Sequence, residues 1–266
     1  MKHIIIAAFV AMLTACSGKV GSDPAKKSDP FDGRPKDKAV YETLVWRDIE
    51  VFEQGGNSAV GYFLDIERVS ADEILSVYEE NEVLGDQRFK GRDIVLSGKI
   101  KAINSGIGDD PYLTFRVKDM FSSPQAHFAE GYREKAATMK KGEEVSLYCT
   151  GGGEAIGTPL LRNCIPIKDA VANIRKMLAE DVVRAYGKKA PEFVWTTGML
   201  VFTRAMANKL PADFTCEGFA NYTCEQKVTE AIGEKKATRD DLIAAGEELK
   251  AEGMKVNQAA LDKIIK

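Results

Sequence analysis

Cysteine and histidine are the side chains with which this 266-residue chain could most readily bind a metal or form a cross-link, and both are few. Four of the five cysteines lie in two local pairs, Cys149 with Cys164 and Cys216 with Cys224. Neither pair has Cys-x-x-Cys spacing, and His127 is the only histidine outside the first few residues, so the pattern argues against a zinc site. Four cysteines allow three pairings. We predict the two local disulfides, no metal site and no cofactor.

The scarcity of histidine also limits catalysis. A Ser-His-Asp or Cys-His arrangement would have to use His127, and no Gly-x-Ser-x-Gly stretch is present. A lone histidine beside Phe128 is more typical of a structural or surface residue. Carboxylate pairs stay open as an alternative. We predict no catalytic residues and no enzymatic activity.

The fifth cysteine, Cys16, follows a short apolar segment. Lys2 precedes the apolar residues 4–13, about half the length of a membrane-spanning helix, in the layout of an export signal. The sequence LTAC at residues 13–16 resembles the lipobox of bacterial lipoproteins. The resemblance implies that residues 1–15 are a signal peptide and that lipid such as palmitate, attached to Cys16, holds the chain in the bilayer. An ordinary secretory signal with a chance cysteine is the alternative.

The residues after Cys16 indicate where the protein works. In lipoproteins an aspartate at the next position often causes retention at the inner membrane, so Ser17 implies the outer membrane, on its periplasmic side. Residues 16–38 are rich in Gly, Ser, Asp, Lys and Pro, which predicts a flexible tether. Disulfides persist in such an oxidising compartment.

The composition is that of a globular protein. The apolar fraction is 44% and the formal net charge is -3. The mature chain of about 250 residues is long enough for one or two domains. No gross charge indicates a nucleic-acid or anionic-membrane partner.

The hydrophobic periodicity predicts both helices and strands. Residues 40–54 favour a helix, with a strand pair turning at residues 55–57 as the alternative. A capping box at residues 70–73 begins a helix that ends near residue 83. The remaining pattern predicts strands at 93–103, 112–118, 124–129 (weak), 144–150 and 160–167, a helix at 130–140, and glycine-rich loops at 104–111 and 151–159.

This order of elements is that of an OB-fold, a five-stranded Greek-key barrel with a helix between strands three and four. Cys149 and Cys164 would then face each other on neighbouring strands. Helical periodicity over residues 169–187, a nearly unbroken apolar stretch at 193–202, and later helix caps at Thr238 and Asn257 predict a C-terminal helical unit. For the apolar stretch we favour a buried helix over a surface-inserting one.

Three segments also carry a family resemblance: ADEILSVYEENEVLGDQRFKGRDIVLSGKIKAI, MKKGEEVSLYC and LLRNC. They resemble OB-fold lipoproteins that are often labelled tRNA-anticodon-binding-like. In that family a Tyr-x-x-Asn-Glu stretch precedes Phe/Tyr-Lys-Gly-Lys and the first barrel strand. The matching residues are Tyr78, Asn81, Glu82, Phe89, Lys90 and Gly91. The resemblance covers about residues 70–167 and implies the fold, whereas the label is an analogy with nucleic-acid binders and not evidence of activity.

OB-folds bind ligands on the outer face of strands two and three. Strand alternation predicts that this face carries Lys99, Lys101, Tyr112, Arg116 and Lys118. Such a face suits an extended anionic ligand, either a single-stranded nucleic acid or an acidic glycan. A solvated sheet face is the alternative, because residues 70–167 hold 15 acidic and 12 basic residues, a balance of -3, whereas nucleic-acid modules are usually basic.

The sequence thus predicts an α+β protein, an OB-fold barrel with a preceding helix and a C-terminal helical unit. We expect a membrane-anchored bacterial envelope lipoprotein whose barrel binds a protein or an envelope polymer without catalysis. Binding of single-stranded nucleic acid is the alternative. The expected segments are a signal peptide (1–15), a tether (16–38), an N-terminal segment (39–69), the barrel (70–168) and the helical domain (169–266).

Overall fold

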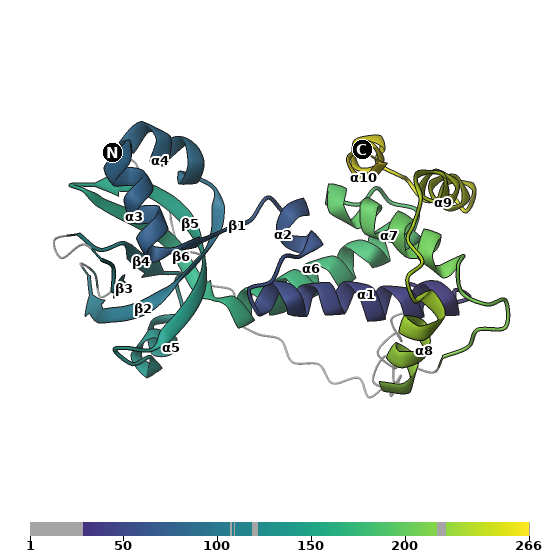
Figure 1. Cartoon of the computed structure of the whole chain (residues 1–266), viewed down its shortest axis with the longest axis horizontal. Helices are drawn as coiled ribbons and strands as arrows, with labels where there is room; N and C mark the ends of the chain where they lie inside the picture. Colours follow the sequence, from purple (N-terminus) through teal and green to yellow (C-terminus); the bar gives the residue numbers. More distant parts are fainter. Residues whose placement is uncertain (1–28, 107, 109, 119–121, 217–221, 266) are drawn as a thin grey trace, which may run out of the picture.

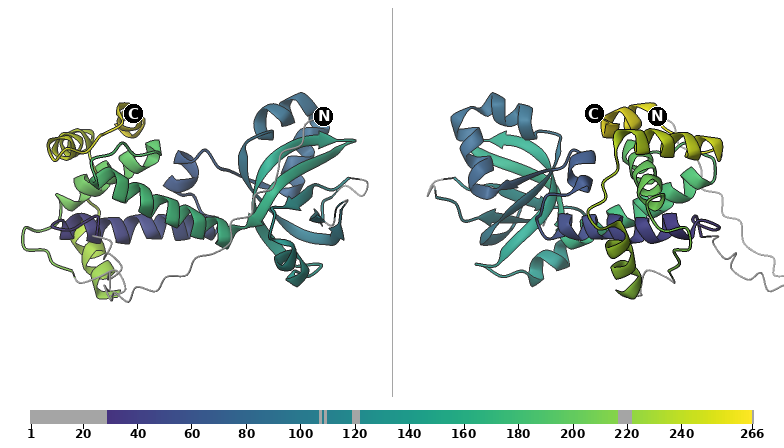
Figure 2. Two further views of the ribbon diagram at one scale, coloured as in Figure 1. Left: turned by 180° about the vertical axis from the view of Figure 1, so that it is seen from behind. Right: turned by 45° about the vertical axis from the view of Figure 1, so that its right-hand side comes forward.

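The computed structural model describes residues 29–265 except 107, 109, 119–121 and 217–221. The strands gather in one barrel, and most of the helices lie to one side of it (Figures 1 and 2). Cys16, the predicted signal peptide and the first part of the predicted tether lie outside the described residues.

Five strands close into a barrel and a sixth lies against it. The sheet order is β1-β2-β3-β4-β6-β5, and a further pairing of β2 with β5 closes the barrel. The strands are β1 (Glu67–Ser70), β2 (Asp93–Ser105), β3 (Pro111–Phe115), β4 (Gln125–Phe128), β5 (Glu144–Ala155) and β6 (Thr158–Pro166). A short helix, α5 (Arg133–Thr138), lies between β4 and β5. The predicted α+β OB-fold is therefore confirmed.

The barrel core follows from the alternation of β2. Its residues Ile94, Leu96 and Ile100 are fully buried, together with Leu113 and Phe115 of β3. Two helices, α3 (Ala71–Glu80) and α4 (Glu82–Phe89), contribute side chains to the same cluster. We predicted one helix here. The structure has two, because the extended backbone of Asn81 ends α3 while its side chain accepts a hydrogen bond from Leu84 N and begins α4.

The glycine triplet at 151–153 is strand and not loop, so the predicted loop at 151–159 is wrong. Its backbone pairs with the short link between α4 and β2: Gly151 N donates to Arg92 O, and Gly91 N donates to Gly151 O, both at 2.9 Å. A Cβ at Gly151 would lie 1.9 Å from Phe89 O, so only glycine permits this approach. The strand therefore continues to Ala155, and the turn to β6 is short.

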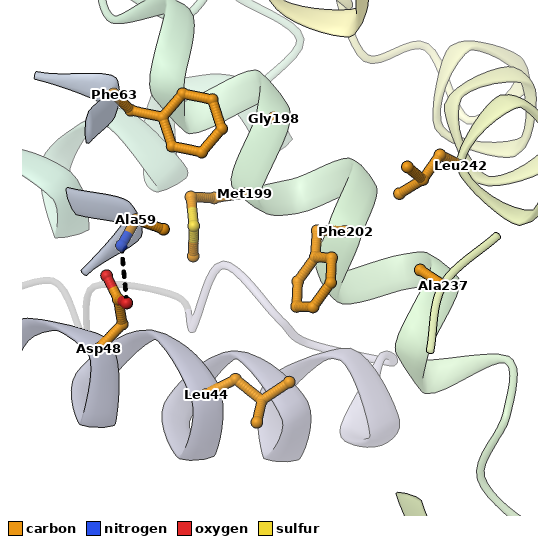
Figure 3. Close-up of a pocket in the computed structure, with 9 residues that line it drawn as sticks. All are labelled: Leu44, Asp48, Ala59, Phe63, Gly198, Met199, Phe202, Ala237 and Leu242. Atoms are coloured by element: carbon orange, nitrogen blue, oxygen red, sulfur yellow. Dashed lines mark hydrogen bonds between the residues drawn. The ribbon is translucent and has the colours of Figure 1, made fainter. Parts of the chain in front are cut away.

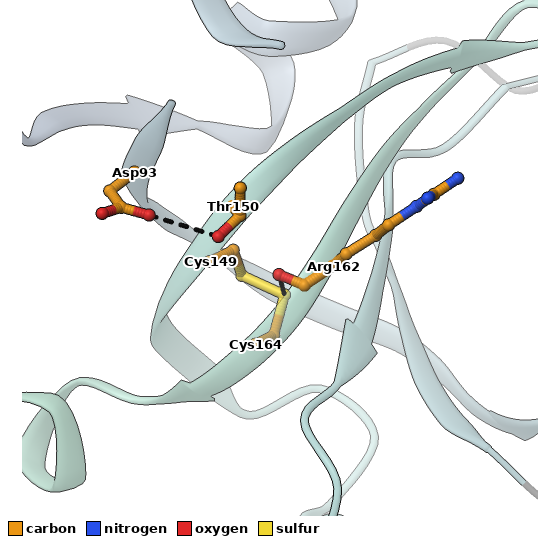
Figure 4. Close-up of a disulfide and its surroundings, with 5 residues drawn as sticks. All are labelled: Asp93, Cys149, Thr150, Arg162 and Cys164. Atoms are coloured by element: carbon orange, nitrogen blue, oxygen red, sulfur yellow. Dashed lines mark hydrogen bonds between the residues drawn. A yellow bond between two sulfur atoms is a disulfide. The ribbon is translucent and has the colours of Figure 1, made fainter. Parts of the chain in front are cut away.

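Both predicted disulfides are present. Cys149 and Cys164 join neighbouring positions of β5 and β6 with a Cα–Cα distance of 4.1 Å, and both are fully buried (Figure 4). Cys216 and Cys224 join the start of α8 (Tyr222–Ile232) to the segment before it. The first pair fixes the hairpin that closes the barrel.

Among the described residues, seven helices make up the helical unit beside the barrel. They are α1 (Pro35–Glu53), α2 (Ala59–Phe63), α6 (Ile167–Tyr186), α7 (Val194–Ala207), α8 (Tyr222–Ile232), α9 (Arg239–Ala251) and α10 (Gln258–Ile265). The helix predicted at residues 40–54 is confirmed, and it packs with the C-terminal helices in one apolar cluster. Since Phe31 is buried in that cluster and α1 begins at Pro35, residues 31–38 are part of the folded unit, and the prediction of a tether up to residue 38 is wrong for them.

The apolar stretch 193–202 forms most of α7, a largely buried helix. The buried-helix interpretation is therefore confirmed. Within the described part of the chain, every helix is too short or too polar to cross a membrane.

The barrel packs on the helical unit through one wall. Val95, Tyr148 and Ile165 lie on the outside of β2, β5 and β6, and they contact the apolar cluster of the helical unit, which includes Ile174 of α6. The connections are short as well: β6 ends at Pro166 and α6 begins at the next residue.

A buried ion-pair cluster joins three helices of this unit. The guanidinium of Arg204 on α7 donates to both carboxylate oxygens of Asp37 on α1, with distances of 2.7–3.1 Å. It also donates to Glu252 at the end of α9 at 2.7 Å and to Glu248 at 3.3 Å. Arg204 and Asp37 are 8% and 5% exposed, so each charge depends on the other for its compensation.

We therefore expect Arg204→Met to destabilise the protein by about 3–5 kcal/mol, because it leaves the carboxylate of Asp37 buried and unpaired. Urea denaturation followed by circular dichroism measures the loss. The matched control is Arg47→Met on α1, whose guanidinium pairs with Glu225 at the surface, and it should lose no more than about 1 kcal/mol. Equal losses in the two variants would contradict the assignment.

Candidate binding face on the barrel

The outer face of β3 and β4 is built by antiparallel pairing. Tyr112 pairs with His127, Leu113 with Ala126, and Thr114 with Gln125. Leu113 and Ala126 are fully buried in the barrel. Alternation therefore directs Tyr112, His127 and their second neighbours, Thr114 and Gln125, outward.

Tyr112 and His127 stack on each other across the two strands. Their ring centroids are 4.9 Å apart and their planes differ by 17°. Both residues are half-buried, so the pair is held in place yet keeps surface accessible to solvent. A rigid pair of flat rings on a sheet is a stacking surface for a base or for a sugar ring.

Charged neighbours surround this ring pair. Burial lowers the pKa of His127, Asp110 raises it, and the positive charge of Arg162 lowers it further. The net shift is downward from an ordinary value of about 6.5, so the imidazole is neutral at pH 7. A neutral imidazole has one donor and one acceptor nitrogen.

Arg162 comes from β6, which runs parallel to β4. Its side chain extends away from the disulfide (Figure 4) and is exposed. It therefore supplies a guanidinium, a good partner for carboxylate or phosphate, beside the ring pair.

The five residues predicted for the ligand face do not form one cluster. Tyr112 lies at one end of β3, and Arg116 follows the other end, about 13 Å away along an extended strand. Arg116 N donates to Lys99 O at 2.7 Å, so these two basic residues are neighbours. Lys101 lies at an irregularity of the β2–β3 register, and its ammonium donates to Ser123 Oγ at 3.1 Å.

Acidic groups border the basic end of the face. Lys99 pairs in register with Glu144 of β5. The backbone N–H of Lys118 donates to the carboxylate of Asp72 on α3 at 2.8 Å. All four basic residues are exposed. The face thus has an aromatic end, made by Tyr112, His127 and Arg162, and a separate basic end with mixed charge.

Two members of the aromatic end, His127 and Arg162, were not predicted as site residues. The alternation in residues 125–128 was the available signal for His127, because an inward Ala126 and Phe128 require an outward His127. No local signal places Arg162, because its nearness to His127 depends on the parallel pairing of β4 with β6.

The helical unit leaves this face open. It contacts the wall formed by β2, β5 and β6, whereas β3 and β4 lie on the side of the barrel away from α1, α6 and α7 (Figures 1 and 2). Among the described residues, no group of three or more His, Cys, Asp or Glu side chains is arranged to hold a metal ion.

Comparison with known families agrees with this architecture. The family model described as tRNA_anti-like matches residues 2–165. The chain belongs to the tRNA_anti-like family. The resemblance to tRNA-anticodon-binding-like OB-fold proteins is therefore confirmed. In this tRNA_anti-like protein the family match ends at Ile165, one residue before the end of β6, so α6 and the later helices lie outside it.

One solved structure is also similar, a crystal structure of a lipoprotein from Klebsiella pneumoniae subsp. pneumoniae MGH 78578 that is described as a candidate nucleic acid-binding protein. The two sequences are 17% identical, the match covers 42% of this chain and 98% of that one, and the TM-score is 0.33. None of the curated proteins compared with this tRNA_anti-like chain matches it significantly.

The geometry around His127 predicts how its pKa responds to its neighbours. Arg162→Gln removes a positive neighbour and should raise the pKa of His127, whereas Asp110→Asn should lower it. An NMR titration of the imidazole Cε1–H signal measures both shifts. The titration uses a chain that begins at Ser17, which lacks His3, so the signal belongs to His127. Unchanged values in both variants would contradict the arrangement.

Proposed function

We propose that this tRNA_anti-like protein is a lipid-anchored envelope protein whose barrel binds an extended polymer on the face of β3 and β4 without catalysis. The observation that carries the proposal is the stacked pair of Tyr112 and His127 beside Arg162, on the face that the helical unit leaves open. A flat ring pair contacts sugar rings, and the guanidinium binds carboxylates. An acidic glycan of the envelope is the polymer that best suits this combination.

The location follows from separate observations. Two disulfides are typical of proteins outside the cytoplasm. The lipobox-like sequence at residues 13–16 supplies the attachment point at Cys16. Ser17 favours the outer membrane, on its periplasmic side.

Single-stranded nucleic acid is the second candidate ligand. The ring pair and Arg162 would suit a base and a phosphate, and Lys99, Lys101 and Arg116 would extend the contact along the same sheet. Both ligands are anionic, so the net charge of the barrel region does not separate them. The proposed location favours the glycan, because an envelope protein meets little nucleic acid.

The binding test uses the chain from Ser17 onward, which contains every described residue. We expect co-sedimentation with purified peptidoglycan, and the double variant Tyr112→Ala/His127→Ala should weaken it about tenfold, equivalent to about 1.4 kcal/mol. Tyr62→Ala, which removes an exposed tyrosine from α2, is the matched control and should bind normally. Circular dichroism checks that each variant is folded.

A fluorescent oligothymidylate titrated over a range of salt concentrations separates the two ligands. Nucleic-acid binding requires an affinity that falls with salt and falls further in the triple variant Lys99→Ala/Lys101→Ala/Arg116→Ala. If the oligonucleotide binds in this way and peptidoglycan does not, the glycan proposal is wrong. If neither binds, the face is not a polymer site.

The anchor is tested in the full chain by metabolic labelling with a palmitate analogue. We expect labelling and membrane fractionation in the wild type and the loss of both in Cys16→Ser. Ser17→Asp should keep the label but shift the protein to the inner-membrane fraction. Undiminished labelling of Cys16→Ser would show that the lipid is attached elsewhere or that the sequence has been misinterpreted.

A further inference from the structure

A second candidate site lies in the helical unit, away from the barrel face. A cavity of about 610 Å³, open on one side, is lined by α1, α2, α7 and the start of α9 (Figure 3). We call it the helical cavity. Its lining residues are Leu44, Asp48, Ala59, Phe63, Gly198, Met199, Phe202, Ala237 and Leu242. The volume is within the range of about 300–1,000 Å³ that small-molecule sites occupy.

The lining of the helical cavity is apolar except for one carboxylate, and that carboxylate is already engaged. The two oxygens of Asp48 accept hydrogen bonds from Ala59 N and Val60 N, each at 2.8 Å, and so cap α2. Figure 3 shows this contact at the edge of the hollow, with Phe63, Met199 and Phe202 turned into it. The cavity therefore offers contact surface to a hydrocarbon and no free charge to a polar ligand.

Phe202 marks the entrance. It is 37% exposed although it lies on α7, most of whose other residues are buried. A phenylalanine ring exposed to water at the mouth of an apolar cavity costs free energy. A ligand that covers the ring removes this cost. Met199, deeper in the cavity, is a flexible side chain that adapts to ligands of irregular shape.

The size of the helical cavity favours a slender ligand. One turn of an α-helix with its side chains, a cylinder 10–12 Å wide and 5.4 Å long, already occupies about 400–600 Å³. Helix-in-groove recognition uses side chains spread over about two turns. A hydrocarbon chain is thinner than a helix, so its whole length can fit in the volume that one helical turn would fill.

The start of the described chain also brings the helical cavity close to lipid. Asp29 pairs with Lys38 of α1, and Phe31 packs on Tyr41 of the same helix, so the N-terminal segment leaves from the helical unit and not from the barrel. Cys16 and Asp29 are thirteen positions apart in the sequence, so the chain between them spans at most about 45 Å. The proposed anchor therefore holds Asp29, which is bound to the start of α1 through Lys38, within that distance of the bilayer.

We propose that the helical cavity binds an acyl chain of a membrane phospholipid. The argument from proximity rests on the anchor proposed above, whereas the apolar lining is independent of it. Binding would combine with the anchor to place the helical unit at the bilayer and the open face of the barrel away from it.

The test uses the chain from Ser17 onward, without attached lipid. Cis-parinaric acid, a fluorescent fatty acid, is titrated into the protein. In parallel the protein is incubated with vesicles of phosphatidylethanolamine and phosphatidylglycerol, repurified, and weighed by native mass spectrometry. We expect saturable binding of one fatty acid and retention of one phospholipid.

Ala237→Trp fills the helical cavity and should weaken fatty-acid binding at least tenfold. Because this variant could also disturb packing, a second variant, Phe202→Ser, removes an apolar side chain from the lining at a partly exposed position. It should also weaken fatty-acid binding. The matched control is Ile243→Trp on α9, which is 40% exposed and does not line the cavity. Tyr112→Ala/His127→Ala should bind lipid normally, so failure of the barrel proposal is distinguishable from failure of this one.

Several results would overturn the proposal. They are an absence of saturable binding, equal affinity in Ala237→Trp, and fatty-acid binding without phospholipid retention, which would indicate a free fatty acid. A photo-reactive residue at position 202 gives a further check in cells. Cross-linking to an envelope protein in place of phospholipid would show that the cavity is a protein-docking site.

Discussion

The pairing of β2 with three other strands is the constraint on which the molecule depends. Its first half lies between β1 and β5, and its second half pairs with β3. The β5 pairing closes the barrel, so both edges of β2 are used and the barrel core is sealed. Its inward residues fill that core, while Val95 on its outer side packs against the helices. One strand thus forms the barrel and joins it to the helical unit.

The other connections reinforce this arrangement. The disulfide between Cys149 and Cys164 closes a loop of 15 residues, which stabilises the fold by about 3 kcal/mol in the chain-entropy estimate. β6 leads directly into α6, and the Arg204 cluster holds α1 and α9 to α7. The barrel wall that contacts the helices is thereby fixed, and β3 and β4 remain open for a ligand. This face is the candidate site because the helical unit leaves it uncovered, and the number of its basic residues matters less.

The two proposed sites lie in different parts of the molecule and suit different ligands. The barrel offers flat rings and a guanidinium at the surface, which suit a polar extended polymer. The helical cavity offers hydrocarbon contact and no free charge. A protein tethered to a bilayer can use the second to orient itself on lipid and the first to reach a polymer beyond it.

Features that depend on contacts between near neighbours in the chain could be predicted from the sequence alone. Period-two alternation gave the barrel strands and their order, the caps at Ser70 and Thr238 gave helix starts, and the spacing of cysteines gave both disulfides. Only the tertiary structure decided that α1 joins the C-terminal helices, that the glycines at 151–153 continue a strand, and that Arg162 lies near His127. Each of these depends on contacts between segments far apart in the chain, which periodicity cannot specify. The predicted basic face is split into an aromatic end and a basic end for the same reason. Alternation tells which side chains point outward, whereas strand register and neighbouring acidic groups determine which of them lie together.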